Sequence, residues 1–184
     1  MLWGDDSAAA SPATARINSL SKARAYVGEG LDDGVRCPCC GQFARRYRRK
    51  LNVGIARWLI ALVRLHAADL EWVHIAWIAA VVGGEAPASA LRRRIGASPI
   101  GSGDYAKARY WGLIEDRPSD SDAKKDSGFW CITDKGRDFV KGTIRLPERV
   151  VIYNNECEGF DGDDISIYDA LGNRFNYADL MAGP

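Results

Sequence analysis

Two cysteines three positions apart, Cys37 and Cys40, have the residue types and the spacing that suit metal chemistry. Thiolates at this spacing can point at one ion from the same turn. Pro38 stiffens the approach to that turn, and Gly41 lets the backbone fold beneath a metal. The pattern therefore predicts that Cys37 and Cys40 are ligands of a zinc ion.

A structural zinc site needs four ligands, and the sequence contains no second Cys-x-x-Cys pair. Cys39 lies inside the turn, and Cys157 lies in a turn-rich segment where a thiol is accessible. We therefore predict one zinc ion per chain, bound by Cys37, Cys40, Cys39 and Cys157. Other sources of the missing ligands stay open: Cys131, which is more typical of a core thiol, His66 and His74, which are more typical of packed helical residues, or a second chain.

A run of cations follows the cysteines. This basic strip consists of Arg45, Arg46, Arg48, Arg49 and Lys50. Residues 35–68 contain eight Lys or Arg and no Asp or Glu, whereas residues 144–184 contain three Lys or Arg and eight Asp or Glu. Such segregation favours contact of the strip with nucleic-acid phosphates. The alternatives are pairing with the chain's own acidic segment or with an acidic protein partner.

Enzymatic chemistry finds little support in the sequence, and we predict that the protein is not an enzyme. The chain has only two His, and it lacks a phosphate-cradling Gly-rich loop and a nucleophile elbow. The acids of 161–164 lack the spacing of a calcium loop and are more typical of a solvated turn.

Length and composition set the organisation of the chain. Its 184 residues allow one domain with an appendage, and the 47% of hydrophobic residues can form a sizeable core. No apolar run is long enough for a membrane span, and the beginning of the chain has no secretory pattern. Five Cys, three of them clustered, indicate a reducing compartment. We therefore expect a cytoplasmic protein with no membrane partner.

Four segments are predicted along the chain. Residues 1–34 form a flexible arm that carries a short helix over 15–26 and is broken at 28–30. Residues 35–51 contain the cysteine turn and the basic strip. Residues 52–143 form the main domain, and residues 144–184 form an acidic β-hairpin with a tail that packs on that domain.

The main domain begins with helical periodicity. Apolar residues recur at three- and four-residue spacing from Asn52 to His66, which predicts an amphipathic helix. Further helices are expected over 70–82, over 87–95 with Pro87 in the first turn, and from Ser102 or Gly103 to Gly112.

After Gly112 the pattern becomes that of strands. Residues 113–115 predict a short strand, 116–128 a polar loop, and 129–132 a returning strand. Thr133 is predicted to cap a helix over 134–141. In the last segment, 149–153 and 165–168 are predicted to be the two strands of the hairpin, separated by a turn-rich stretch.

Two motifs carry a family resemblance. The stretch Trp111-Gly112-Leu113-Ile114 and the stretch Ile132-Thr133-Asp134-Lys135-Gly136-Arg137 resemble winged helix-turn-helix domains of the MarR and PadR regulators. The resemblance covers roughly 52–141 and implies an α+β fold: a winged helix-turn-helix core with an N-terminal zinc-knuckle extension and a C-terminal β-hairpin. The whole chain also resembles small proteins of tailed phages.

The resemblance implies a DNA-binding face on the recognition helix and the wing. Candidate contacts are Ser102, Lys107, Arg109 and Tyr110 on the helix, and Lys124 and Lys125 at the wing tip. We therefore predict a phage accessory or regulatory protein that binds nucleic acid, most simply duplex DNA, in the cytoplasm of the bacterial host. Its homodimerisation is plausible. The alternative is a protein-binding inhibitor or adaptor that acts on host machinery without binding DNA.

Overall fold

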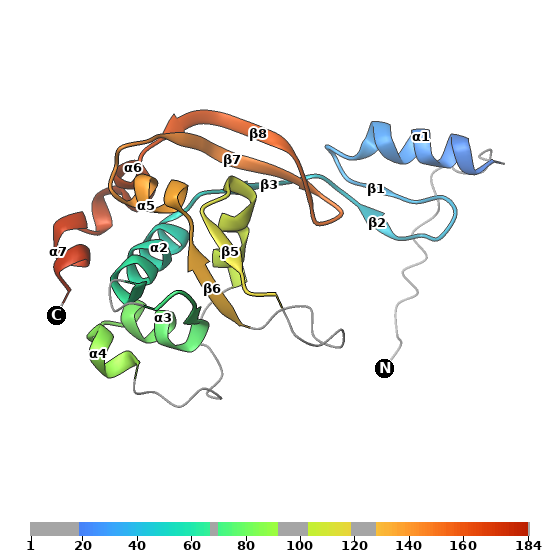
Figure 1. Ribbon diagram of the computed structural model, residues 1–184. Helices are drawn as coiled ribbons and strands as arrows, with labels where there is room; N and C mark the ends of the chain where they lie inside the picture. Colours follow the sequence, from blue (N-terminus) through green and yellow to red (C-terminus); the bar gives the residue numbers. More distant parts are fainter. Residues whose placement is uncertain (1–18, 67–69, 92–102, 119–127, 184) are drawn as a thin grey trace, which may run out of the picture. The chain divides into compact units, whose positions relative to one another are not determined.

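The computed structural model describes residues 19–66, 70–91, 103–118 and 128–183, and in them helices and strands mix in an α+β fold (Figure 1). The chain divides into two compact units. We call residues 1–47 with 152–156 the cysteine unit, and residues 48–151 with 157–184 the core unit. The α+β class predicted from the sequence is confirmed. No helix in the described ranges has the length and apolarity needed to cross a membrane.

The cysteine unit contains helix α1 (Leu20–Gly30) and the two short strands β1 (Val35–Arg36) and β2 (Phe43–Ala44), which pair antiparallel. The helix predicted over 15–26 is described only from Leu20 onward, and it runs through the glycines where a break was predicted. A Cβ on Gly30 would approach the Val35 Cβ to 2.8 Å. Glycine is therefore tolerated at this helix end because it lets β1 pack closely against α1.

In the core unit, helix α2 (Val53–His66) forms as predicted. Its apolar stripe includes Ile55, Leu59 and Leu62, which are buried. The Asn52 side-chain oxygen accepts the Ile55 N–H at 3.0 Å and so caps the first turn. This helix lies at the centre of the unit's core, because it contacts five other helices: α3 (Ile75–Val82), η2 (Gly103–Trp111), α5 (Asp134–Val140), α6 (Ile167–Leu171) and α7 (Tyr177–Ala182).

The helix predicted over 70–82 is wrong in its first part. Strand β4 (Val73–His74) precedes helix α3 (Ile75–Val82), and Val73 pairs with Trp130. The reason is local: His74 Nδ1 accepts the Ala76 N–H at 3.2 Å and starts the helix there. Helix α4 (Pro87–Ala90) begins at Pro87 as predicted, while residues 92–95 of the predicted helix lie outside the described residues.

Next along the chain comes η2 (Gly103–Trp111), which is a 3₁₀ helix. Strands β5 (Ile114–Asp116) and β6 (Phe129–Ile132) then pair antiparallel, and helix α5 (Asp134–Val140) follows with Thr133 as its cap, all as predicted. The three-stranded sheet has the order β4-β6-β5. Gly136 closes this corner, because a Cβ there would overlap the Leu113 carbonyl.

A second sheet has the strand order β3-β7-β8, formed by β3 (Tyr47–Lys50), β7 (Leu146–Tyr153) and β8 (Glu156–Ile165). The predicted strand over 149–153 lies in β7, but the second predicted strand is wrong. Residues 156–165 form β8, and Ser166 starts helix α6 (Ile167–Leu171). Asn154 and Asn155 both have positive φ, 49° and 64°, and make the tight two-residue turn between β7 and β8. The chain continues with η3 (Gly172–Arg174) and α7 (Tyr177–Ala182).

Candidate nucleic-acid interface and cysteine turn

The cysteine turn, residues 37–41, is closed by backbone hydrogen bonds. The Gly41 N–H donates to the Cys37 carbonyl, and the Cys37 N–H donates to the Gln42 carbonyl, both at 2.8 Å. Gly41 has φ +72°, a conformation that favours glycine. The Arg36 guanidinium donates to the Gly41 carbonyl at 3.1 Å. The strands β1 and β2 thus hold the turn at their common end.

The thiols of the turn differ in their electrostatics. The Cys39 N–H, and after it the Cys40 N–H, donates to the Cys37 sulfur, and this lowers the pKa of Cys37 below 9.0. Desolvation and then the charge of Cys37 raise the pKa of Cys39. The thiolate form is therefore stabilised at Cys37 and destabilised at Cys39 relative to an ordinary cysteine.

All three thiols of the turn line one hollow of about 620 Å³ in the cysteine unit. Leu20 and Val27 of α1 face it, together with Phe43 and Tyr47. Three of these apolar side chains are well exposed, with fractions of 62% for Leu20, 55% for Phe43 and 45% for Tyr47. The turn therefore lies beside an open apolar surface.

The other candidate ligands lie in the core unit. The exposed Cys157 thiol on β8 donates to the Gly159 carbonyl at 3.6 Å, and the Cys131 thiol on β6 to the Ile132 carbonyl at 3.5 Å. His66 Nδ1 lies 3.5 Å from an Arg137 nitrogen, and His74 caps α3. Within the described ranges, no three His, Cys, Asp or Glu side chains are grouped so that they could hold a metal ion. The three cysteines of the turn thus line one hollow without forming a metal-binding group, and the predicted zinc stays a prediction.

The basic strip is partly paired with acids. Arg46 contacts Asp32 at 3.1 Å within the cysteine unit. In the core unit, Arg48 contacts Asp161 at 3.3 Å and Lys50 contacts Glu148 at 2.7 Å. Arg45 and Arg49 are exposed on the same stretch.

Both acids that pair with the strip in the core unit belong to the acidic segment 144–184. Glu148 also contacts Arg149 at 2.6 Å, and the hydrogen bond from Lys50 is the main cause that lowers the pKa of Glu148 below 4.5. Internal pairing, one of the alternatives left open by the sequence, therefore occurs at Arg48 and Lys50. The Arg48–Asp161 pair is exposed on both sides, and exposed pairs contribute little stability, so this pair can exchange with phosphate.

The helix η2 carries the other candidate contacts. Its Tyr105 ring stacks on Trp58 of α2 with centroids 4.8 Å apart, and its Trp111 indole N–H donates to the Pro147 carbonyl at 2.8 Å. These contacts fix both ends of η2 on the core unit.

On the outer side of η2, Lys107 pairs with Asp104 of the same helix. The exposed Arg109 guanidinium lies 5.1 Å from the centroid of the Tyr110 ring. Arg109 and Tyr110, which are adjacent in the sequence, thus contact each other, and their role in binding stays a prediction. Ser102, Lys124 and Lys125 lie outside the described residues.

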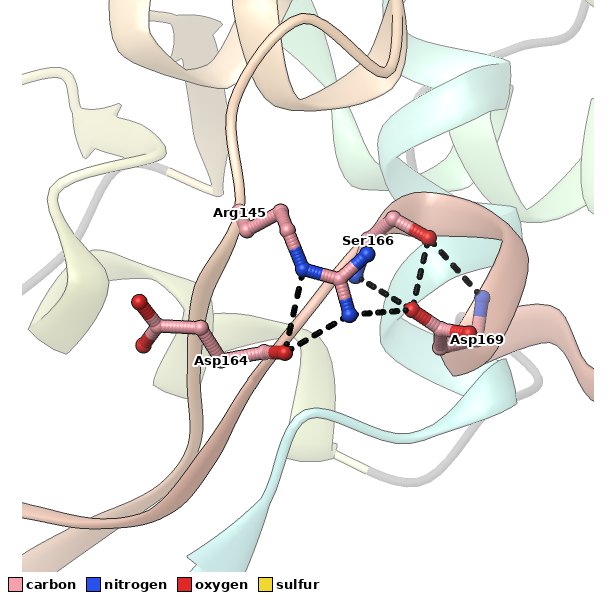
Figure 2. Close-up of polar contacts among 4 residues, drawn as sticks. All are labelled: Arg145, Asp164, Ser166 and Asp169. Carbon is pink, nitrogen blue, oxygen red and sulfur yellow. Dashed lines mark hydrogen bonds and ion pairs between the residues drawn. The ribbon is translucent and has the colours of Figure 1, made fainter.

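Sequence reasoning missed a polar network at the start of α6 (Figure 2). The Ser166 N–H and hydroxyl both donate to the Asp169 carboxylate at 2.8 Å, and the Asp169 N–H donates back to the hydroxyl at 3.3 Å. The Arg145 guanidinium donates one hydrogen bond to the Asp169 carboxylate at 3.1 Å and another to the Asp164 carbonyl at 2.8 Å. The pattern Ser166-x-x-Asp169 was the available signal, because it is that of a capping box. Since these groups satisfy one another, the network is structural.

Comparisons of the chain with protein-family models, with curated proteins and with solved structures gave no match.

Proposed function

We propose that residues 52–143 form a winged helix-turn-helix domain that binds duplex nucleic acid. The observation that carries this proposal is the order of elements, α2-β4-α3-α4-η2-β5-β6, together with the sheet order β4-β6-β5. In a winged helix, the helix that immediately precedes the hairpin is the recognition helix, and the hairpin is the wing. Here η2 would be that helix and β5–β6 would be the stem of the wing. The protein would then serve as an accessory or regulatory factor, and the resemblance to tailed-phage proteins favours a role in a phage.

The proposed interface is centred on η2. Arg109 is the exposed cation of this helix, and the neighbouring Tyr110 ring supports its guanidinium. Lys107 would have to exchange its Asp104 carboxylate for a phosphate. The charged groups of η2 are therefore better suited to phosphate contact than to readout of base edges. We expect affinity for duplex DNA with little sequence preference.

The basic strip would add a second phosphate contact. Full participation of its five cations would give a log–log salt dependence of about −4 to −5. Because Arg48 and Lys50 already contact Asp161 and Glu148, binding there replaces one anion with another. We therefore expect a salt dependence that is shallower than five unpaired cations would give.

A titration of random-sequence duplex DNA over a range of salt concentrations tests the proposal. Arg109→Ala should weaken binding and reduce the magnitude of the slope by about 1, as expected for the loss of one phosphate contact. Arg174→Ala is the matched control, because it removes an exposed cation from η3, away from η2 in the sequence. It should leave the slope unchanged. Equal losses in the two variants would contradict a specific role for η2.

Internal pairing of the strip favours one alternative, an inhibitor or adaptor that binds a protein partner through its charged faces. The acids of β8 are exposed along an edge of the sheet β3-β7-β8, where a basic partner could contact them. If the wild-type protein shows no duplex binding even at low salt, the nucleic-acid proposal fails and this alternative is favoured.

A further inference from the structure

The described residues of the cysteine unit form very little apolar core. Among its described residues, the buried apolar side chains are Ala23, Leu31 and Ile152. A unit of this size cannot bury enough apolar surface to offset its conformational entropy, and such units usually depend on a metal, a disulfide or oligomerisation. The apolar core formed by the described residues therefore gives this unit little stability of its own.

The cysteine turn is shaped to supply such a link. Backbone bonds of 2.8 Å close the turn at Cys37, and Gly41 takes the left-handed conformation that the reversal needs. The three cysteines of the turn line one hollow, so the turn presents its thiols to an open space. Cys37 and Cys40 are three residues apart, the spacing at which two thiolates chelate one ion.

One copy of the turn supplies only half of a tetrahedral thiolate site. The segments of the cysteine unit, 1–47 and 152–156, contain no His and no Cys other than Cys37, Cys39 and Cys40. Cys39 occupies the position between the chelating pair. Cys131 and Cys157 belong to strands of the core unit, where each thiol donates to a carbonyl of its own strand.

We propose that Cys37 and Cys40 from two copies of this chain together bind one zinc ion as a tetrathiolate. Zinc with four thiolates carries a net charge of −2, which the nearby cations Arg36 and Arg45 would offset. The exposed apolar side chains beside the turn would be covered by the second copy. Metal binding and dimerisation would then stabilise the same unit, independently of the interface on η2.

Two measurements on the tag-free full-length protein, purified under reducing conditions, test this proposal. Elemental analysis should give one zinc per two chains, and the mass in solution should be twice the 20.2 kDa of one chain. Chelation should remove the zinc and give monomers, and added zinc should restore the dimer. Cys37→Ser and Cys40→Ser should each abolish both zinc binding and dimerisation.

Cys39→Ser is the matched control, because it changes a thiol of the same turn that lies outside the proposed ligand set. It should retain both zinc and dimer. Amide exchange of α2 in each variant distinguishes loss of the site from general unfolding.

Three results would overturn the proposal. A zinc-bound monomer with one zinc per chain would mean that the same chain completes the site, and loss of that zinc in Cys157→Ser would identify its ligand. Protein without metal in the reduced state would exclude zinc. A dimer that persists after chelation would show that pairing does not depend on the metal.

Discussion

The cysteine unit and the core unit are stabilised in different ways. In the core unit, α2 alone buries Ile55, Leu59, Leu62 and Leu65 almost completely, and Trp111 and Phe139 are among the largest side chains that are fully buried there. In the cysteine unit, large apolar side chains such as Phe43 and Leu20 remain exposed, and only Ala23, Leu31 and Ile152 are buried among its described apolar residues. The core unit is thus stabilised by packing, whereas the thiols of the cysteine unit lie where apolar packing is poor.

This difference assigns different roles to similar polar features. In the core unit, the capping box of Ser166 and Asp169 uses its donors and acceptors internally (Figure 2). In the cysteine unit, the amides of Cys39 and Cys40 stabilise a sulfur that faces an open hollow. A self-satisfied network is structural, whereas an organised but accessible set of thiols is the better candidate for ligand binding.

The largest expected effect is on packing in the core unit, through Gly136→Ala. A Cβ there would overlap the Leu113 carbonyl and lie 2.8 Å from Ile132 Cγ1, and neither the backbone nor a packed side chain can yield cheaply. We expect a loss of several kcal/mol in the free energy of unfolding, measured by urea denaturation. Lys135→Ala on the exposed side of the same helix should change it by less than about 0.5 kcal/mol.

The two units differ in how much of their structure could be predicted from the sequence. The α2 stripe, the Thr133 cap and the pairing of β5 with β6 follow from periodicity and local motifs, so the core unit was largely predictable. The errors there occurred where a single residue or turn outweighed the periodic pattern. His74 caps α3, so the helix begins later than its apolar periodicity predicted. The turn at Asn154 and Asn155 leads directly into β8, so a strand forms in a stretch whose Gly and Asp residues predicted a turn.

The candidate sites were less predictable, because they depend on contacts between segments distant in sequence. The cysteines of the turn were found from their spacing. Pairing of the basic strip with the acidic segment was one alternative, but the sequence did not identify Asp161 and Glu148 as the partners of Arg48 and Lys50. The sequence of a basic run is the same whether its side chains are solvated, paired with acids or bound to a ligand, so the sequence alone does not distinguish these cases.

Metal removal should affect the two units differently. If zinc links the cysteine turns, a chelator should cause loss of amide protection in α1 and in residues 35–44, while protection in α2 should persist because of its buried stripe. Hydrogen exchange followed by mass spectrometry measures both units in one experiment. Unchanged protection of the cysteine unit would show that its stability does not depend on a metal.

A smaller effect is expected from Ser166→Ala at the start of α6. The variant removes the hydroxyl that accepts the Asp169 N–H and donates to the Asp169 carboxylate. The loss should be about 1 kcal/mol in the free energy of unfolding, from urea denaturation. Ser19→Ala at the exposed cap of α1 removes the bond of 3.3 Å from the Lys22 N–H and the contact of 3.2 Å with the Ser21 hydroxyl, and it should leave the stability of the core unit unchanged.

The Asp169 carboxylate should also make part of the core unit's stability dependent on pH. The Ser166 N–H is the first cause that lowers the pKa of Asp169 below 3.8. A lowered folded-state pKa gives stability that is present above pH 3.8 and is lost as the pH falls through the folded-state value. Asp169→Asn should therefore lower the free energy of unfolding at pH 7, and the loss should become progressively smaller below pH 3.8. Urea denaturation at pH 7 and at several pH values below 3.8 measures this loss. A constant cost would indicate that the carboxylate's charge is not responsible.

The smallest expected effect is a gain in the cysteine unit. Gly28 lies within α1, and a Cβ there meets no other atom within 4 Å. Gly28→Ala should stabilise the helix by about 0.5–1 kcal/mol, because alanine loses less backbone entropy on folding. Gly30→Ala is the control in the same helix, and it should destabilise the unit because its Cβ would collide with Val35.

The gain from Gly28→Ala should be clearest in amide exchange of α1 after chelation. A unit already linked by metal opens rarely, so a small increase in helix stability changes its protection little, whereas an unlinked unit is marginal and responds fully. Equal gains before and after chelation would mean that the metal and the helix contribute independently. A gain confined to the chelated protein would identify the cysteine turn as the element that limits the stability of this unit.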